Sequence, residues 1–362
     1  MKKNLFILAV AGLALASCSS DETTASQATS QANEISFRPL MNNVTRAVDI
    51  NSASDLTSFN VTAFRATTPS ATEYFAGVKF TGPTTYTSTP KYYWPTENVN
   101  FYAWSAHSGN TDAAETVVTG ATEQVTGTYN AIVVTPAADA SQQADLIYAK
   151  SLNTAKAASI PLAFSHAESR IVLKVKNTSA NISFAVTGWR LGFMVPNGTY
   201  NGSIETPTWS SLGSATANNV YTNTFSSQPV SGNTTTAALI PGAQAQIMIP
   251  QTITPVSAYA GNSVGDKPNS AYIAIQYTAT NTSTTEAIVA SATWAMWKIP
   301  AITWEAGKQY TYTIDLADGG YFETNQNTDD ANLDPILGGY IQFASVTVST
   351  WNTTPGEINA GM

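Results

Sequence analysis

Apolar and polar residues alternate along most of this chain, which is the pattern of β-strands that bury one face. Proline, glycine and asparagine separate the runs, and no stretch shows a helical period. Short strands divided by turn residues in this way are typical of an antiparallel β-sandwich. The clearest runs are Phe59/Val61/Ala63, Val99/Phe101/Ala103, Ile160/Leu162/Phe164, Ile171/Leu173/Val175 and Tyr310/Tyr312/Ile314/Leu316.

The strand-like runs fall into two groups, and a chain of 362 residues is long enough for about two domains. We expect an N-terminal β-sandwich over residues 47–157 and a larger C-terminal one over 158–362. A stretch rich in Thr, Asn, Ser and Gly, roughly 196–236, interrupts the second group. The pattern therefore predicts an all-β protein with two tandem antiparallel β-sandwich domains.

A short strand that precedes the first group predicts a processing event. Ile35 and Phe37 share one face of it, and Leu40 follows before the chain reaches Arg46, a lone basic residue. A trypsin-like protease that cut between Arg46 and Ala47 would detach this strand. Its neighbours would then keep unpaired N–H and C=O groups beside an apolar groove, which is a template for another chain's strand. We therefore expect residues 19–46 to hold a tether and a removable strand.

Residues 1–18 have the features of an export signal, with Lys2 and Lys3 ahead of an apolar run too short to span a membrane. The run ends in Leu-Ala-Ser-Cys18, which resembles the lipobox of bacterial lipoproteins, where the cysteine is acylated. We expect Cys18 to carry the lipid and to be the only membrane anchor of the precursor. The alternative is an ordinary signal peptide with an incidental cysteine. Because Cys18 is the single cysteine, no disulfide is expected in the mature chain.

The composition is unusually poor in charge. Only 11% of the residues are charged, compared with roughly 25% in an average soluble protein. The net charge is −8, and the part after residue 46 is also acidic. Proteins that bind nucleic acid need a basic surface, so we exclude nucleic acid as a partner. An uncharged, threonine-rich surface on alternating strands is typical of an extracellular β-protein.

Catalytic and metal-binding groups are scarce. The chain has two histidines, His107 and His166, and we expect His166 to be structural although Glu168 lies two residues on. Residues 329–334, Asp-Asp-Ala-Asn-Leu-Asp, resemble the opening of a calcium loop, but Pro335 and Ile341 stand where such a loop has glycine and glutamate. A solvated loop is favoured over a weak calcium site. The sequence predicts no enzyme, no cofactor and no metal.

Aromatic residues gather in Tyr92-Tyr-Trp-Pro95 and in the stretch that ends at Trp104, and Tyr200, Trp209 and Tyr221 lie in the polar stretch. Core packing is the favoured interpretation of both groups. A surface that stacks against sugars is the alternative, and it would suit a carbohydrate-binding surface lipoprotein that is never processed.

Several of these segments together resemble the fimbrillin family. The N-terminal ones are Tyr-Trp-Pro95, the stretch from Val99 to Trp104 and Asp-Leu-Ile-Tyr-Ala149. The C-terminal ones are Pro161-Leu-Ala-Phe-Ser-His-Ala-Glu-Ser-Arg-Ile171, Trp304-Glu-Ala-Gly-Lys-Gln-Tyr-Thr-Tyr-Thr-Ile-Asp-Leu316 and Val346-Thr-Val-Ser-Thr-Trp351. The lipobox and the Thr-Arg-Ala47 site also match, so the resemblance covers almost the whole chain.

This resemblance implies a type V pilus subunit with two transthyretin-like β-sandwich domains. Such subunits are exported as outer-membrane lipoproteins, cut after an arginine by a trypsin-like protease, and polymerised by donor-strand exchange into a fimbrium that supports adhesion and biofilm formation. The partners would be other pilus subunits and possible host glycans or proteins. Carried onto this chain, the donor strand would lie within residues 335–362, although little chain remains after Trp351.

Overall fold

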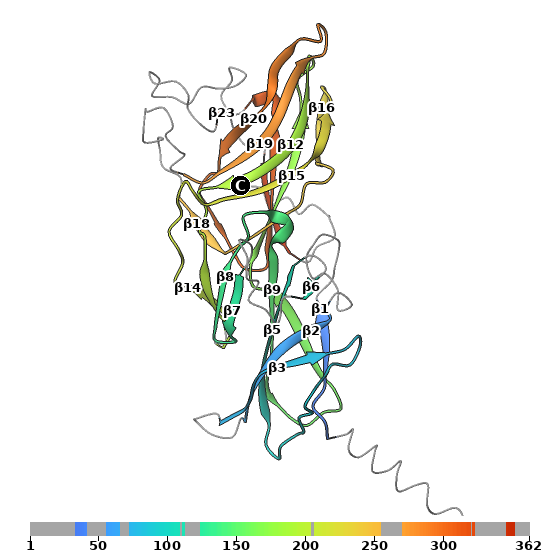
Figure 1. Cartoon of the computed structure of the whole chain (residues 1–362), viewed down its shortest axis with the longest axis vertical. Coiled ribbons are helices and arrows are strands. Elements are labelled where there is room, and N and C mark those ends of the chain that lie inside the picture. The colour runs from blue at the N-terminus through green and yellow to red at the C-terminus, as the bar shows by residue number, and fades with distance from the viewer. Residues whose placement is uncertain are drawn as a thin grey trace, which may run out of the picture.

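The computed structural model shows an elongated molecule made of β-strands (Figure 1). It describes residues 33–41, 56–65, 72–108, 111–112, 124–203, 206–254, 270–319, 321–322 and 345–351. Besides strands, these residues form only two short 3-10 helices, η1 (Ala140–Gln142) and η2 (Leu316–Asp318). The predicted all-β fold is confirmed.

An eight-stranded sheet forms the lower end of the molecule in Figure 1. Its order is β1 (Phe37–Met41), β10 (Ile160–His166), β9 (Ala144–Thr154), β5 (Val99–Ser108), β2 (Ser58–Arg65), β3 (Thr72–Thr81) and β4 (Thr87–Ser88), and β6 (Thr111–Asp112) pairs with β5. The inward faces of these strands share one aromatic-rich core. Their neighbours pair antiparallel, except that β1 runs parallel to β10.

Two five-stranded sheets face each other in the C-terminal part. The first contains β16 (Thr234–Leu239), β11 (Ser169–Asn177), β22 (Lys308–Asp315) and β24 (Ser345–Thr350) in that order, and β17 (Gln246–Met248) pairs with β11. The second has the order β15 (Val220–Val230), β12 (Ile182–Gly192), β19 (Tyr272–Asn281), β20 (Ala287–Lys298) and β23 (Tyr321–Phe322). Strictly alternating strands such as β11 give each sheet one buried face, and these faces form the larger core.

A small sheet joins the two parts. Strands β7 (Gln124–Thr128) and β8 (Ala131–Thr135) come from the first expected domain, and β13 (Gly198–Asn201) and β14 (Thr208–Ser210) come from the second. The side chain of Gln143 adds a buried link, since it accepts a hydrogen bond from the Ile247 amide at 2.7 Å. The remaining pair is β18 (Gln251–Ile253) with β21 (Ile302–Trp304). The polar stretch 196–236 therefore contributes strands, although its sequence shows no clear alternation.

The boundary between the cores lies later than residue 157. Strand β10, which we assigned to the second group from its sequence, pairs with β9 and β1 and buries Ile160, Leu162 and Phe164 in the N-terminal core. The C-terminal core begins with Ile171. Strand β11 pairs with β22 in parallel, so the sheets are not purely antiparallel as we had expected.

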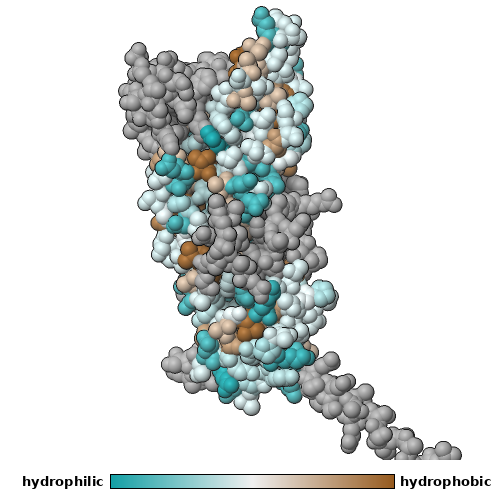
Figure 2. Space-filling model, viewed as in Figure 1, coloured by the Kyte–Doolittle hydropathy of each residue, from teal (hydrophilic) through white to brown (hydrophobic). Residues whose placement is uncertain are grey.

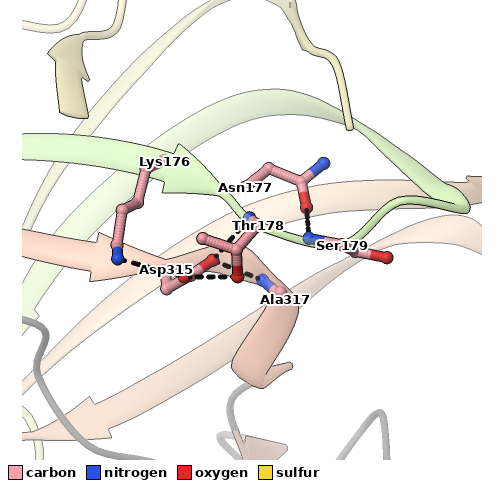
Figure 3. Close-up of polar contacts among 6 residues, drawn as sticks. All are labelled: Lys176, Asn177, Thr178, Ser179, Asp315 and Ala317. Atoms are coloured by element: carbon pink, nitrogen blue, oxygen red, sulfur yellow. Dashed lines mark hydrogen bonds and ion pairs between the residues drawn. The ribbon is translucent and has the colours of Figure 1, made fainter. Parts of the chain in front are cut away.

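A polar network fixes one end of β11 against β22 (Figure 3). Asp315 accepts hydrogen bonds from the Thr178 hydroxyl at 2.7 Å, from the Thr178 amide at 3.1 Å and from the Ala317 amide at 3.1 Å, and Lys176 lies 3.3 Å away. Burial alone would raise the pKa of Asp315, but these donors outweigh it and hold the pKa below the ordinary 3.8. The ionised carboxylate thus ends the strand and starts η2.

Hydrophobic residues on the face shown in Figure 2 form small separate patches among polar ones. Within the described ranges, no helix is long and apolar enough to cross a membrane.

Candidate functional site

Residues 33–41 close the N-terminal sheet on itself. On one side, β1 pairs with β10, and Ile160 donates its amide to the Ser36 carbonyl at 2.9 Å. On the other side, Phe37 exchanges two main-chain hydrogen bonds with Tyr86, at 3.0 and 2.8 Å, just before β4. Without β1, the row of strands would end in β10 and β4, so this segment is the seam that joins the two edges.

Further main-chain bonds extend the seam ahead of β1. The Ile35 amide donates to the Tyr92 carbonyl, and the Trp94 amide donates to the Asn33 carbonyl, both at 2.8 Å. The segment is therefore paired along both edges, as a central strand is. Its removal would leave two rows of unpaired groups facing each other across a groove.

Phe37 lies at the centre of a cluster of aromatic rings in the N-terminal core. This ring has no exposed surface and lies 4.7 Å from Phe80, 5.2 Å from Phe101 and 5.9 Å from Phe59 between ring centroids, each in an edge-on arrangement. Tyr86 packs against Phe59 at 5.1 Å. Edge-on contacts of this kind stabilise the buried ring beyond the effect of the area that it buries, so this position favours a large aromatic side chain.

Two lysines contact the start of the segment. Lys91 bonds the Glu34 carboxylate at 2.7 Å, and Lys156 bonds the side-chain oxygen of Asn33. The hydrogen bond and the charge of Glu34 raise the pKa of Lys91. Lys91 is 58% exposed and Glu34 only 9%, and the other carboxylate oxygen of Glu34 is buried without a hydrogen-bond partner. The Glu34 carboxylate is thus held by Lys91 through one of its two oxygens.

Ile35, Phe37 and Leu40 were predicted to lie on this segment as a removable strand, and its removal stays a prediction. Ile35 and Phe37 are fully buried, whereas Leu40 is 41% exposed. Residues 35, 37 and 39 face the core, so the period of two turns Leu40 outward beside Arg38. Leu40 thus belongs to β1 but adds little buried apolar area.

Several other predicted residues lie outside the described ranges. They are Cys18, Arg46, Ala47, residues 329–334 and most of the expected donor region 335–362. The part of that region which the structure describes is β24, and it pairs with β22 of its own chain. Beyond β24, Trp351 is 4% exposed, and its ring stacks on His166 at a centroid distance of 4.0 Å.

The histidine that we expected to be structural lies in a buried contact between the two cores. His166 ends β10, and its Nδ1 is 2.9 Å from Asp145 on β9. Nothing is described of the His107 side chain. Among the described residues, no cluster of histidines and carboxylates is arranged to hold a metal ion.

The sequence did not predict which residues pair with the two edges of the segment, namely those of β10 on one side and residues 86–94 on the other. The alternation of Ile160, Leu162 and Phe164 was visible, but nothing local connects it with residue 37. The contact with Lys91 had one signal in the sequence. This was Glu34, an acidic residue directly ahead of the alternating pair Ile35 and Phe37. Tyr200 and Tyr221 are buried, and the Trp209 indole donates to the Ala167 carbonyl at 2.7 Å, so these rings pack as expected rather than form a sugar platform.

Comparison with known proteins gave a family and a set of solved structures. A fimbrial protein from Bacteroides vulgatus is 15% identical and covers 88% of this chain and 100% of its own, with a TM-score of 0.49. A protein described in terms of cell adhesion from Bacteroides ovatus is also 15% identical and covers 89% and 98%, with a TM-score of 0.48. No curated protein sequence matches significantly. The fimbrillin-like profile matches residues 45–335, and the chain belongs to the fimbrillin-like family.

Proposed function

We propose that this protein is a structural subunit of a surface pilus, assembled by protease-triggered donor-strand exchange, and that the pilus supports adhesion and biofilm formation. The observation that carries the proposal is the seam at residues 33–41. A segment near the start of the chain completes the N-terminal sheet, and the basic residue Arg46 follows five positions after its last residue, Met41. Family membership supports the same role.

The energetics suit a strand that stays in place until it is cut. Burial of Ile35 and Phe37 contributes about 1.5–3 kcal/mol each, and the paired main chain adds to this. While the chain is intact, the segment is tethered at high effective concentration. A cut after Arg46 would convert the contact into a bimolecular one, so another strand could replace the segment at little net cost.

The proposal includes a path through the cell envelope. The precursor would be a lipoprotein held at the outer membrane by Cys18, and a trypsin-like protease would release the body by cutting the Arg46–Ala47 bond. Other pilus subunits would then supply the replacing strand.

The test compares Arg46→Ala with Arg38→Ala in the form that lacks residues 1–18. Arg38 is exposed on β1 and is the matched control, because it is basic and lies on the same segment. After limited trypsin digestion, we expect a new N-terminus at Ala47 and polymers from the wild type and from Arg38→Ala. Arg46→Ala should remain full-length and monomeric. Polymers from uncut Arg46→Ala, or a stable monomer after cutting at Arg46, would contradict the proposal.

The same samples test the alternative of an unprocessed carbohydrate-binding lipoprotein. That function requires sugar binding by the uncut monomer and no polymer under any condition.

A further inference from the structure

We propose that β10 couples the seam at residues 33–41 to β24, so that pairing of the first segment stabilises the second. While residues 33–41 occupy the seam, β10 keeps His166 in the buried contact with Trp351 that holds the end of β24. Loss of the segment from the seam loosens this contact and the end of β24 with it. The coupling is a property of the uncut chain and does not depend on the proposed strand exchange.

Strand β10 depends on β1 for most of its main-chain pairing. In the described part of the chain, β9 pairs with β10 only at Ser165 and His166. Residues 160–164 pair with β1 and with no other described strand. Without β1, these residues would lose their strand partner, and unpaired main-chain groups are costly unless water reaches them. The first part of β10 would then be held by side-chain packing alone.

The side chains of β10 depend on the seam as well. Alternate residues of the strand, from Ile160 to His166, are buried. The Phe164 ring lies 5.3 Å from Phe59, and Phe59 lies 5.9 Å from Phe37, between ring centroids. Loss of the Phe37 ring would leave a cavity beside Phe59, into which the surrounding side chains relax. Because packed interiors transmit strain, this relaxation displaces Phe164 and the two residues that follow it.

At the end of β10, His166 is held from two sides. Its Nδ1 lies 2.9 Å from Asp145 of β9, and its ring stacks on the Trp351 indole at a centroid distance of 4.0 Å and an interplanar angle of 9°. The Trp351 amide also donates to the Gly307 carbonyl at 2.9 Å. The buried indole is thus fixed between the end of β10 and the turn ahead of β22.

Strand β24 has few other contacts that hold it. Among the described strands, it pairs with β22 alone. Trp351 is the only buried residue in the range 345–351, and Val348 is 36% exposed. A strand with one paired edge and exposed side chains opens at low cost, so its protection from hydrogen exchange depends on the Trp351 contact. Through this contact, β10 acts on β24.

Hydrogen exchange of the uncut form without residues 1–18 tests the coupling. Phe37→Ala removes the ring at the seam, and Leu40→Ala is the matched control, because Leu40 lies on the same strand but is 41% exposed. We expect Phe37→Ala to raise the exchange rate of β24 amides about tenfold, within the usual range of coupling between two sites. Strand β16, at the opposite edge of the same sheet, should keep its rates, and Leu40→Ala should change neither strand. Phe37→Leu gives the same comparison with a smaller cavity if Phe37→Ala does not fold.

The reverse direction gives a second readout, because a coupling free energy is shared by the two sites. Trp351→Ala should raise the exchange rate of the Ile160 amide, which donates to the Ser36 carbonyl in the seam. Val348→Ala is the matched change on β24 and should leave this amide unaffected. In the double variant of Phe37→Ala and Trp351→Ala, β24 amides should exchange as fast as in Trp351→Ala alone, because the contact is already absent.

Three results would overturn the coupling. They are unchanged β24 amides in the Phe37 variant, rates in the double variant that equal the product of the two single effects, and an equal rise in β16 and β24. The last result would mean that the whole C-terminal part is affected rather than this contact. Each measurement uses uncut protein, so failure of the coupling is distinct from failure of cleavage after Arg46.

Discussion

Replacement of Phe37 by alanine should destabilise the N-terminal sheet of the precursor more than any other single change in residues 33–41. The ring is fully buried and touches three other phenylalanines, and Phe→Ala changes at such sites cost about 3–5 kcal/mol. Each kcal/mol lowers the unfolding midpoint of a domain of about 150 residues by roughly 2–4 °C. We therefore expect a shift of about 10 °C for the transition that involves the N-terminal sheet.

The measurement is thermal and urea unfolding of the uncut form without residues 1–18, with hydrogen exchange of β10 amides to identify the transition. Leu40→Ala is the matched control, because Leu40 lies on the same strand but is 41% exposed, and such surface changes stay within about 0.5 kcal/mol. Protection of β10 should fall in Phe37→Ala and remain in Leu40→Ala. If both variants lose the same stability, the segment is not held by its aromatic contacts, and the reasoning fails.

Three further predictions concern the C-terminal part. The lowered pKa of Asp315 means that its ionised form stabilises the fold above the unfolded pKa of about 3.9, and this stability is lost as pH falls through the lower folded pKa. Asp315→Asn should therefore flatten the acid limb of a plot of stability against pH and cost about 1–3 kcal/mol at neutral pH. An unchanged acid limb would contradict this prediction. Gly192→Ala should destabilise by about 1–3 kcal/mol in urea unfolding, because a Cβ there would lie 2.0 Å from the Tyr272 ring, and Tyr272→Ala should relieve the clash in the double variant. Trp351→Ala should raise the hydrogen-exchange rate of β24 amides at least tenfold, whereas Val348→Ala should change it little, since Trp351 is the buried anchor of that strand; equal effects would refute this.

The seam shows why the sequence alone reveals only part of a candidate site of this kind. The alternation of Ile35 and Phe37 and the basic residue after them are local features, so the sequence predicted a buried strand followed by a cleavage site. Which strands form its walls depends on residues 86–94 and 160–164, which are separated from it by about 50 to 120 positions along the chain. No periodicity within a window of ten residues carries that information.

The sequence by itself determined the strand pattern, the acidic and weakly charged composition and the residues able to fill an aromatic core, because alternation and side-chain chemistry are properties of short segments. Only the tertiary structure decided that β1 runs parallel to β10, that β10 belongs to the N-terminal core, and that Leu40 faces outward while Lys91 meets Glu34. These outcomes depend on which edges meet when the sheet closes, and that choice is made by the summed packing of distant side chains rather than by any one segment.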